Sequence, residues 1–198
     1  MTTRAAMRAT VRTRLGDTGA TTLWDDATLD AAIADALRGY GAHLPRERTT
    51  PVVVAAGARR LALPPEAARA LRVVDPAGRA VERWRAPGEP ATGAAGQAWR
   101  AWDGGVSLAE PAQAGTWQVD SLGPRSLPTD DAADLDIVAG DEDVVALLAA
   151  AFALERRAAD EAKRGVAPIR GGTAGLAGEA RAEAERALRA RRRRARLG

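Results

Sequence analysis

The sequence predicts an α+β protein that is mainly a helical bundle, with a small antiparallel β insertion in its middle. Apolar residues recur at helical spacing towards both ends of the chain. Short alternating segments between glycine and proline turns fill the middle. Valine, leucine, isoleucine and phenylalanine total only 35 of the 198 residues, against 48 alanines. Because an alanine side chain buries little apolar area, we expect the core to be thin. Contacts with neighbouring copies of the chain are expected to complete its burial.

Two helices are expected first, over residues 3–15 and from Asp25 to about Gly41. Asp25 is a good N-cap, because its carboxylate can accept a hydrogen bond from the free amides of the first turn. A large apolar residue directly before the cap and another at the fourth helical position form a hydrophobic staple. The staple and apolar face of this second helix comprise Trp24, Leu29, Ile33, Leu37 and Tyr40.

Short strands are expected in the middle of the chain. Their segments are residues 52–57, 59–65, 71–84, 98–102, 106–110 and 116–123. Residues 71–84 contain a DPAG turn between two apolar stretches and form the clearest hairpin. The expected core of the insertion is Trp84, Trp99, Trp102 and Trp117, which supply bulk to a small sheet. A carbohydrate-binding surface built from the same rings is an alternative.

An acidic segment, residues 129–143, precedes the most apolar stretch of the chain. Its carboxylates do not have the spacing of an EF-hand calcium loop. Asp141 is expected to cap a helix whose first half, Val144–Leu154, is apolar on every side and is therefore buried on several faces. We expect Val144, Leu148 and Phe152 to complete the core of the bundle.

The chain ends in a glycine-rich linker, residues 165–178, and a basic helix, residues 179–198. Glutamates occupy the first turns of this helix and arginines the last, as the helix dipole favours. Such an arginine-rich tail suits contacts with acidic protein surfaces or with phosphates. The residues expected to make such contacts are Arg186, Arg189, Arg191, Arg192, Arg193, Arg194 and Arg196.

The predicted organisation has four parts. They are N-terminal helices over 1–48, a β-rich insertion over 49–127, an acidic loop and central helix over 128–164, and a linker with a basic helix over 165–198. Cysteine is absent, and the single histidine, His43, has no serine or acidic partner in a catalytic motif. We therefore expect no enzyme activity, no metal site and no cofactor. No stretch reaches the roughly 20 apolar residues that a membrane helix needs, so no membrane partner is expected.

Three segments carry a likeness to a known family. They are LWDDATLDAAIADALRGY (23–40), RRLALPPEAARALRVVDPAGR (59–79) and DEDVVALLAAAFALERRAADEAKR (141–164). In this order the chain resembles the head-to-tail adaptor, or connector, proteins of tailed double-stranded-DNA phages and gene transfer agents. The likeness extends over residues 3–164, in patterns of capping and burial. The large insertion departs from the simplest, all-helical members.

The resemblance implies a structural virion protein of the phage neck, made in the cytoplasm of a bacterial host. Such adaptors form a homo-oligomeric ring, usually a dodecamer, beneath the portal protein. The ring extends the DNA channel used in viral genome packaging and docks a stopper or tail-neck protein. The C-terminal segment commonly reaches the portal, which assigns residues 165–198 to portal docking and brings DNA in the channel within reach. The alternative is a nucleic-acid-binding protein that acts through the arginine-rich C-terminal tail, with steeply salt-dependent affinity.

Overall fold

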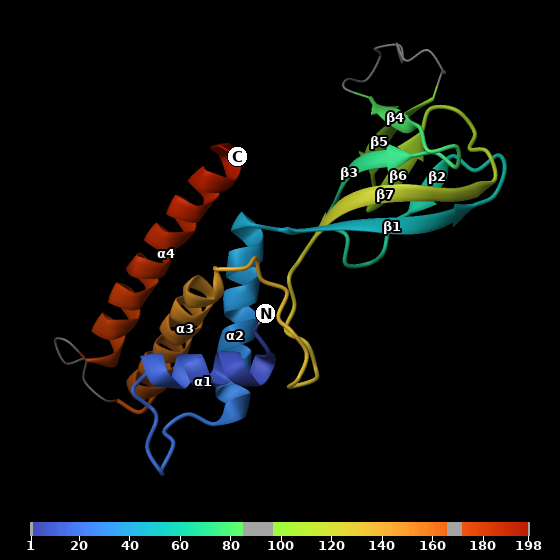
Figure 1. The fold of residues 1–198 in the computed structure, drawn as a ribbon. Helices are drawn as coiled ribbons and strands as arrows, with labels where there is room; N and C mark the ends of the chain where they lie inside the picture. The colour runs from blue at the N-terminus through green and yellow to red at the C-terminus, as the bar shows by residue number, and fades with distance from the viewer. Residues whose placement is uncertain (1, 85–96, 166–171, 198) are drawn as a thin grey trace. The chain divides into compact units, whose positions relative to one another are not determined.

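The structure is a computed structural model that describes residues 2–84, 97–165 and 172–197, with backbone alone from residue 192 onward (Figure 1). It divides into two compact units. The helical unit comprises Met1–Leu44 and Arg125–Gly198, and the β unit comprises Pro45–Pro124. The β unit is therefore inserted in the chain between the two parts of the helical unit.

Four helices build the helical unit: α1 (Arg4–Arg14), α2 (Asp26–His43), α3 (Glu142–Lys163) and α4 (Thr173–Leu197). The start of α2 has a local cause, because the Asp25 carboxylate accepts a hydrogen bond from the amide of Thr28 at 2.6 Å. The N-cap prediction for Asp25 is thus confirmed. In α1 the Thr3 hydroxyl accepts a bond from the Ala6 amide in the same way.

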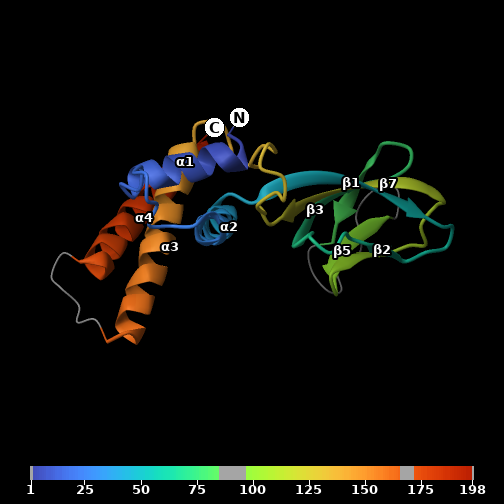
Figure 2. The same ribbon diagram turned by 90° about the horizontal axis from the view of Figure 1, so that it is seen from below.

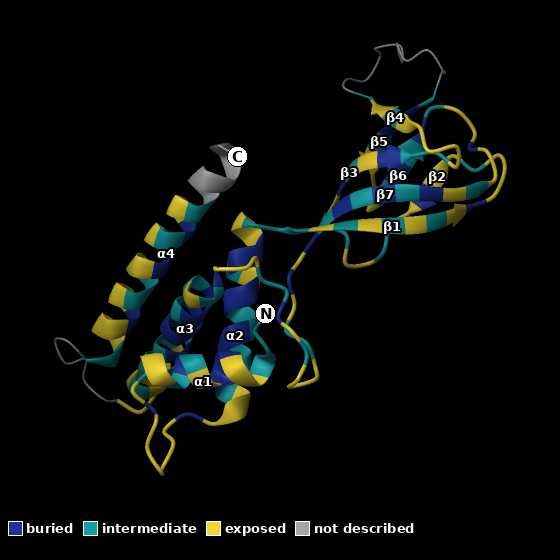
Figure 3. Ribbon diagram, viewed as in Figure 1, coloured by how far each residue is buried: buried dark blue, intermediate teal, exposed yellow. Residues whose placement is uncertain are grey.

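The core of the helical unit lies where α3 packs against α1, α2 and α4 (Figure 3). The fully buried residues Leu29, Ile33, Leu37 and Tyr40 come from α2, and the nearly buried Trp24 and Leu148 join them. Val144 and Phe152 are only half-buried and pack on the edge of this core. Much of the remaining core is alanine, since α3 alone buries Ala146, Ala149, Ala150, Ala151 and Ala153.

The last helix begins earlier than the sequence indicates. Residues 173–178, expected to belong to the linker, form the first turns of α4 despite their glycines. Leu176, the large apolar residue of these turns, is 50% exposed, whereas Ala177 and Leu188 are buried. The packing of small alanines against α3 therefore selects the face of α4 that is buried, and the bulkier Leu176 stays outside it.

Seven strands form one sheet in the β unit (Figure 2). They are β1 (Arg46–Val54), β2 (Arg60–Ala62), β3 (Arg69–Val74), β4 (Ala80–Arg83), β5 (Ala98–Trp102), β6 (Gly105–Leu108) and β7 (Gly115–Gly123). The strand order is β1-β7-β3-β4-β5-β6-β2. All neighbouring pairs are antiparallel except β4 and β5, which run parallel. The two outermost strands, β1 and β2, also contact each other, so the sheet curls into a nearly closed barrel.

The predicted fold class, a mainly helical bundle with a small antiparallel β insertion, is wrong. The protein is a mixed α/β fold whose described residues contain a seven-stranded, barrel-like sheet and four helices. The sheet has its own buried cluster, centred on Trp99, Trp117, Val73 and Val119. Because the strands have a hydrophobic core of their own, they form a separate compact unit. A small insertion in a helical bundle would have no such core.

Candidate interaction surfaces

Three arginines at four-residue spacing on α1 form an ion-pair network inside the helical unit. Arg4, Arg8 and Arg12 contact Asp17, Asp26, Asp30 and Asp131. The Arg8 side chain is only 11% exposed. The partners come from the loop after α1, from α2 and from the acidic segment, so the network joins three parts of the unit. Asp131 of the acidic segment therefore has a structural role, because its ion pair with Arg8 links that segment to α1.

Asp17 and Asp131 of this network, and the Asp25 cap beside it, have pKa values below their ordinary range. Hydrogen bonds from the amides of Leu23 and Trp24, together with Arg12, lower the pKa of Asp17. A hydrogen bond from Arg8 lowers the pKa of Asp131. The Thr28 side chain and amide lower the pKa of the Asp25 cap.

Stability is expected to fall on acidification for this reason. A carboxyl with a lowered folded-state pKa binds fewer protons in the native than in the unfolded state, so its contribution is complete above the unfolded pKa. That contribution is lost as the pH drops from about 5 towards about 3. The melting temperature measured by calorimetry should fall as the pH is lowered from about 5 to about 3. The melting temperature of the Asp131→Asn variant should fall less than that of the unaltered chain. A melting temperature that stays level or rises over this range would contradict the linkage.

A second polar cluster joins α2, α3 and α4. The Tyr40 hydroxyl donates to Asp141 Oδ2 at 2.7 Å, and Arg191 Nε lies 2.8 Å from Asp141 Oδ1. Asp141 is 3% exposed. Burial, and then the Asp141 hydrogen bond, raise the pKa of Tyr40 above its ordinary value. Asp141 stands at the N-cap position of α3 but makes no capping bond with its side chain, so the predicted capping by this carboxylate is wrong.

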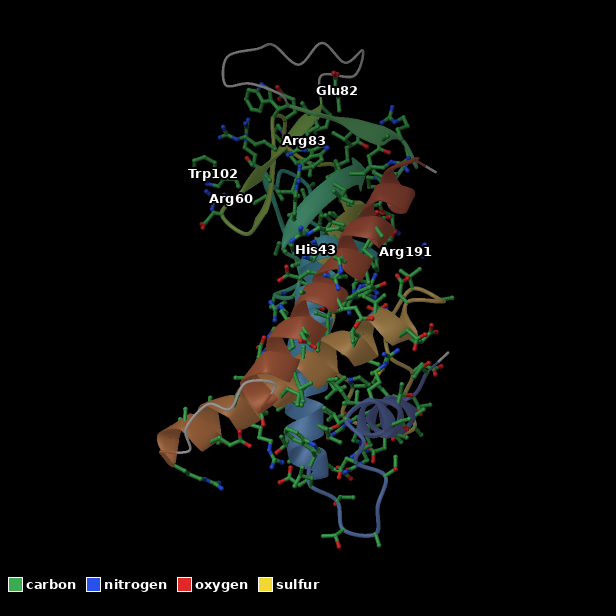
Figure 4. The ribbon with its side chains drawn as sticks, turned by 90° about the vertical axis from the view of Figure 1, so that its left-hand side faces the viewer. His43, Arg60, Glu82, Arg83, Trp102 and Arg191 are labelled. Carbon is green, nitrogen blue, oxygen red and sulfur yellow. The ribbon has the colours of Figure 1, made fainter. Side chains whose placement is uncertain are left out.

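The arginines of the basic helix do not form one described site. Arg191, labelled in Figure 4, is held by Asp141, and Arg189, though exposed, pairs with Glu185 at 3.1 Å. Arg186 is exposed on α4. The side chains of Arg192, Arg193, Arg194 and Arg196 lie outside the described residues, although the backbone there continues the helix to Leu197.

The four tryptophans expected in the β core separate into two groups. Trp99 and Trp117 are each 1% exposed and belong to the buried cluster. Trp84 is half-buried, and Trp102 is 51% exposed, so Trp102 is not a core residue. Strand alternation is the cause, because Trp102 lies three positions after Trp99 and therefore on the opposite face of β5.

The outward residues of β5 and its neighbours form what we call the cation–aromatic face, made of Trp84, Arg100, Trp102, Arg60 and Ser107. The Arg100 guanidinium carbon lies 5.3 Å from the centre of the Trp84 ring and 4.7 Å from that of Trp102. Distances under about 6 Å are those of cation–π contacts. Arg60 and Arg100 both stand opposite Ser107, so one row crosses strands β2, β6 and β5.

A shallow groove of about 230 Å³ lies along this face between Arg60 and Trp102. Small residues make up much of the groove lining. Among them, Gly105 stands opposite both Trp102 and Ala62 in the strand register. Gly105 has no room for a side chain, since an added Cβ would meet the Leu61 carbonyl oxygen at 2.9 Å. Figure 4 places the labelled Arg60 and Trp102 at the same end of the β unit. This face was not among the predicted sites, although the alternation in AWRAW (98–102) is a signal in the sequence that indicates it.

No arrangement typical of a metal site or membrane helix stands out within the described ranges. His43 is exposed near the end of α2. Across residues 2–84, 97–165 and 172–197, no group of three or more histidine, aspartate or glutamate side chains is placed to hold a metal ion. In the part of the chain that the structure describes, no helix combines the length and apolar character of a transmembrane span.

Comparison with known proteins gives distant likenesses among solved structures only. No family model matches the sequence, and no curated protein matches it. Among the matching solved structures is one described as "Neck of empty GTA particle computed with C6 symmetry". The match covers 89% of this chain and 88% of that chain, with 18% identity and a TM-score of 0.28. Identity and superposition at this level are too low to assign the chain to a family.

Proposed function

We propose that this chain is a structural protein of a virion neck, a head-to-tail adaptor that forms a ring beneath the portal. The supporting observation is the way its two adaptor-like helical segments come together. Residues 23–40 and 141–164 are far apart in the sequence, yet they provide α2 and α3, which pack on each other in one core. The β unit between them in the chain leaves this helical core undivided.

In this role the helical unit provides the rigid body of a ring subunit. Its ion pairs and its Asp141 cluster join α1, α2, α3 and α4 around a core in which alanine is abundant. The exposed side of α4 carries Arg186, which suits an acidic partner such as the rim of a portal. The ring would continue the DNA channel from the portal to a stopper or tail-neck protein.

The test is reconstitution with the portal encoded in the same genome. Purified chain and portal are mixed, and electron microscopy and native mass spectrometry record whether a ring of copies adds to the portal. We expect a ring, usually twelve copies, on the portal and little ring formation without it. The chain alone and the portal alone are the controls. A chain that leaves the portal bare at micromolar concentration overturns the proposal.

The nucleic-acid-binding alternative finds less support in the described side chains. Of the three tail arginines whose side chains are described, Arg191 and Arg189 already have carboxylate partners. Binding of the isolated chain to a short DNA duplex, with an affinity that falls steeply as salt is raised, would favour this alternative.

A further inference from the structure

We propose that the cation–aromatic face binds the acidic segment of a second copy of this chain, around Asp130, Asp134 and Val138, so that neighbouring copies join head to tail. The inference rests on the proposed ring and names the surfaces that would build it. The two surfaces are different, one on the β unit and one on the helical unit. A contact between unlike surfaces repeats from copy to copy and generates a ring when the rotation closes.

The cationic side of the contact is oriented in advance. Arg100 is held between the Trp84 and Trp102 rings, and it forms no ion pair among the described residues. Its buried Nε has no hydrogen-bond partner in the described structure. Arg60, in the same row, is exposed and likewise forms no ion pair within the described part of the chain. Guanidinium groups bind carboxylates through paired hydrogen bonds, and a group held in place loses little entropy on binding.

The apolar side of the contact is Trp102. Its ring is 51% exposed beside the groove floor at Gly105 and Ala62. Tryptophan and arginine are the residues most often found at the energetic centres of protein interfaces. The groove is shallow and small, and suits one apolar side chain flanked by carboxylates better than a large ligand.

The acidic segment offers the matching groups. Asp130 and Asp134 are exposed and form no ion pair among the residues the structure describes, whereas Asp131 between them is held by Arg8. Val138, 38% exposed, lies a few residues further along the same segment. Two unpaired carboxylates and an exposed apolar residue thus complement Arg60, Arg100 and Trp102.

The charge of the β unit favours a carboxylate partner over nucleic acid. Between Pro45 and Pro124 the chain has ten arginines against eight acidic residues. Asp103, which is exposed, lines the groove directly after Trp102, and the exposed Glu82 lies two residues before Trp84. A phosphate backbone carries charge along its whole length and would approach these carboxylates. A short segment with two aspartates, in contrast, can bind through ion pairs with Arg60 and Arg100 alone.

Charge reversal with rescue tests the contact. Arg100→Glu is expected to reduce ring formation on the portal by about tenfold or more, since like charges face each other in the interface. Asp130→Arg/Asp134→Arg should reduce it similarly. Combining Arg60→Glu and Arg100→Glu with these two substitutions in one chain should restore rings, because both arginines and both aspartates of the contact are then reversed. Trp102→Ala should also reduce ring formation, and Arg69→Glu, an exposed arginine of β3 outside the face, is the matched control.

The outcomes separate the two proposals. If the unaltered chain adds no ring to the portal, the proposed function fails. If it does form rings and Arg100→Glu and Trp102→Ala form them equally well, or if the combined substitutions restore nothing, this inference is overturned while the adaptor function stands. Circular dichroism of each variant shows whether it is folded. Quenching of tryptophan fluorescence by single-stranded DNA, lost in Trp102→Ala, would assign the face to nucleic acid and also overturn the inference.

Discussion

Replacing Trp117 by alanine is expected to destabilise the β unit by about 4 kcal/mol, the cost typical of deleting a buried tryptophan. The side chain is 1% exposed, and its Nε1 donates to the Gln113 carbonyl at 3.1 Å. With Trp99 it supplies most of the bulk in a cluster whose other members are small or medium in size. A unit of this size has a free energy of unfolding of only a few kcal/mol, so we expect the sheet to unfold.

Thermal and urea unfolding, followed by circular dichroism and by tryptophan fluorescence, measures this effect. Trp102→Ala is the matched control, because it removes the same residue type from the same unit at a site that is 51% exposed. Its expected cost is about 1 kcal/mol or less, as for most surface substitutions. Equal losses in the two variants would show that Trp117 does not hold the inner face of the sheet together.

The sequence predicted the local features of this fold well. The start of α2 follows from Asp25 and the amides next to it, and both capping and burial period are readable over a few residues. The turn of the β3–β4 hairpin is likewise local: the Asp75 carboxylate accepts from the amides of Ala77 and Arg79. Where the cause of a structure lies within one turn of chain, a single sequence is enough to identify it.

Features that depend on distant pairing could not be predicted in this way. The contact between β1 and β2 turns seven strands into a barrel-like sheet, and no local pattern indicates which strand edges meet. The parallel pairing of β4 with β5 joins strands that are separated by residues 85–96. The fold class was therefore wrong although most of the short strands were expected; β1 begins at Arg46, six residues before the strand expected at 52–57.

The candidate site shows the same division. Side chains alternate between the two faces of a strand, so Trp99 and Trp102 in AWRAW (98–102) lie on opposite faces of β5. The exposure of Trp102 could therefore have been predicted from the sequence. The stacking of Arg100 between Trp84 and Trp102 could not, because Trp84 reaches Arg100 through a parallel strand pair. The row from Arg60 to Arg100 needs the register of β2 and β6, which only the structure supplies.

Replacing Asp141 by alanine is expected to destabilise the helical unit by about 3 kcal/mol, because it removes the common acceptor of a buried tyrosine and an arginine. From its position before α3, Asp141 was expected to cap the helix. Its carboxylate oxygens instead contact Tyr40, about a hundred positions earlier in the chain, and Arg191. Without the carboxylate, the Tyr40 hydroxyl loses its acceptor and the Arg191 guanidinium loses its counter-charge. Hydrogen exchange should then show faster opening at the C-terminal end of α4 than at its start.

Two further variants divide the effect into its parts. Asp143→Ala, in the same first turn of α3 but with a side chain that is 84% exposed and paired only with Arg14, should change stability by about 0.5 kcal/mol or less. Tyr40→Phe keeps the Asp141–Arg191 pair and removes one hydrogen bond, for an expected loss of about 1 kcal/mol. If Asp143→Ala cost as much as Asp141→Ala, the helix dipole would be the cause. The expected order, with the largest loss for Asp141→Ala and the smallest for Asp143→Ala, would instead show that one buried carboxylate anchors α4 to the rest of the helical unit.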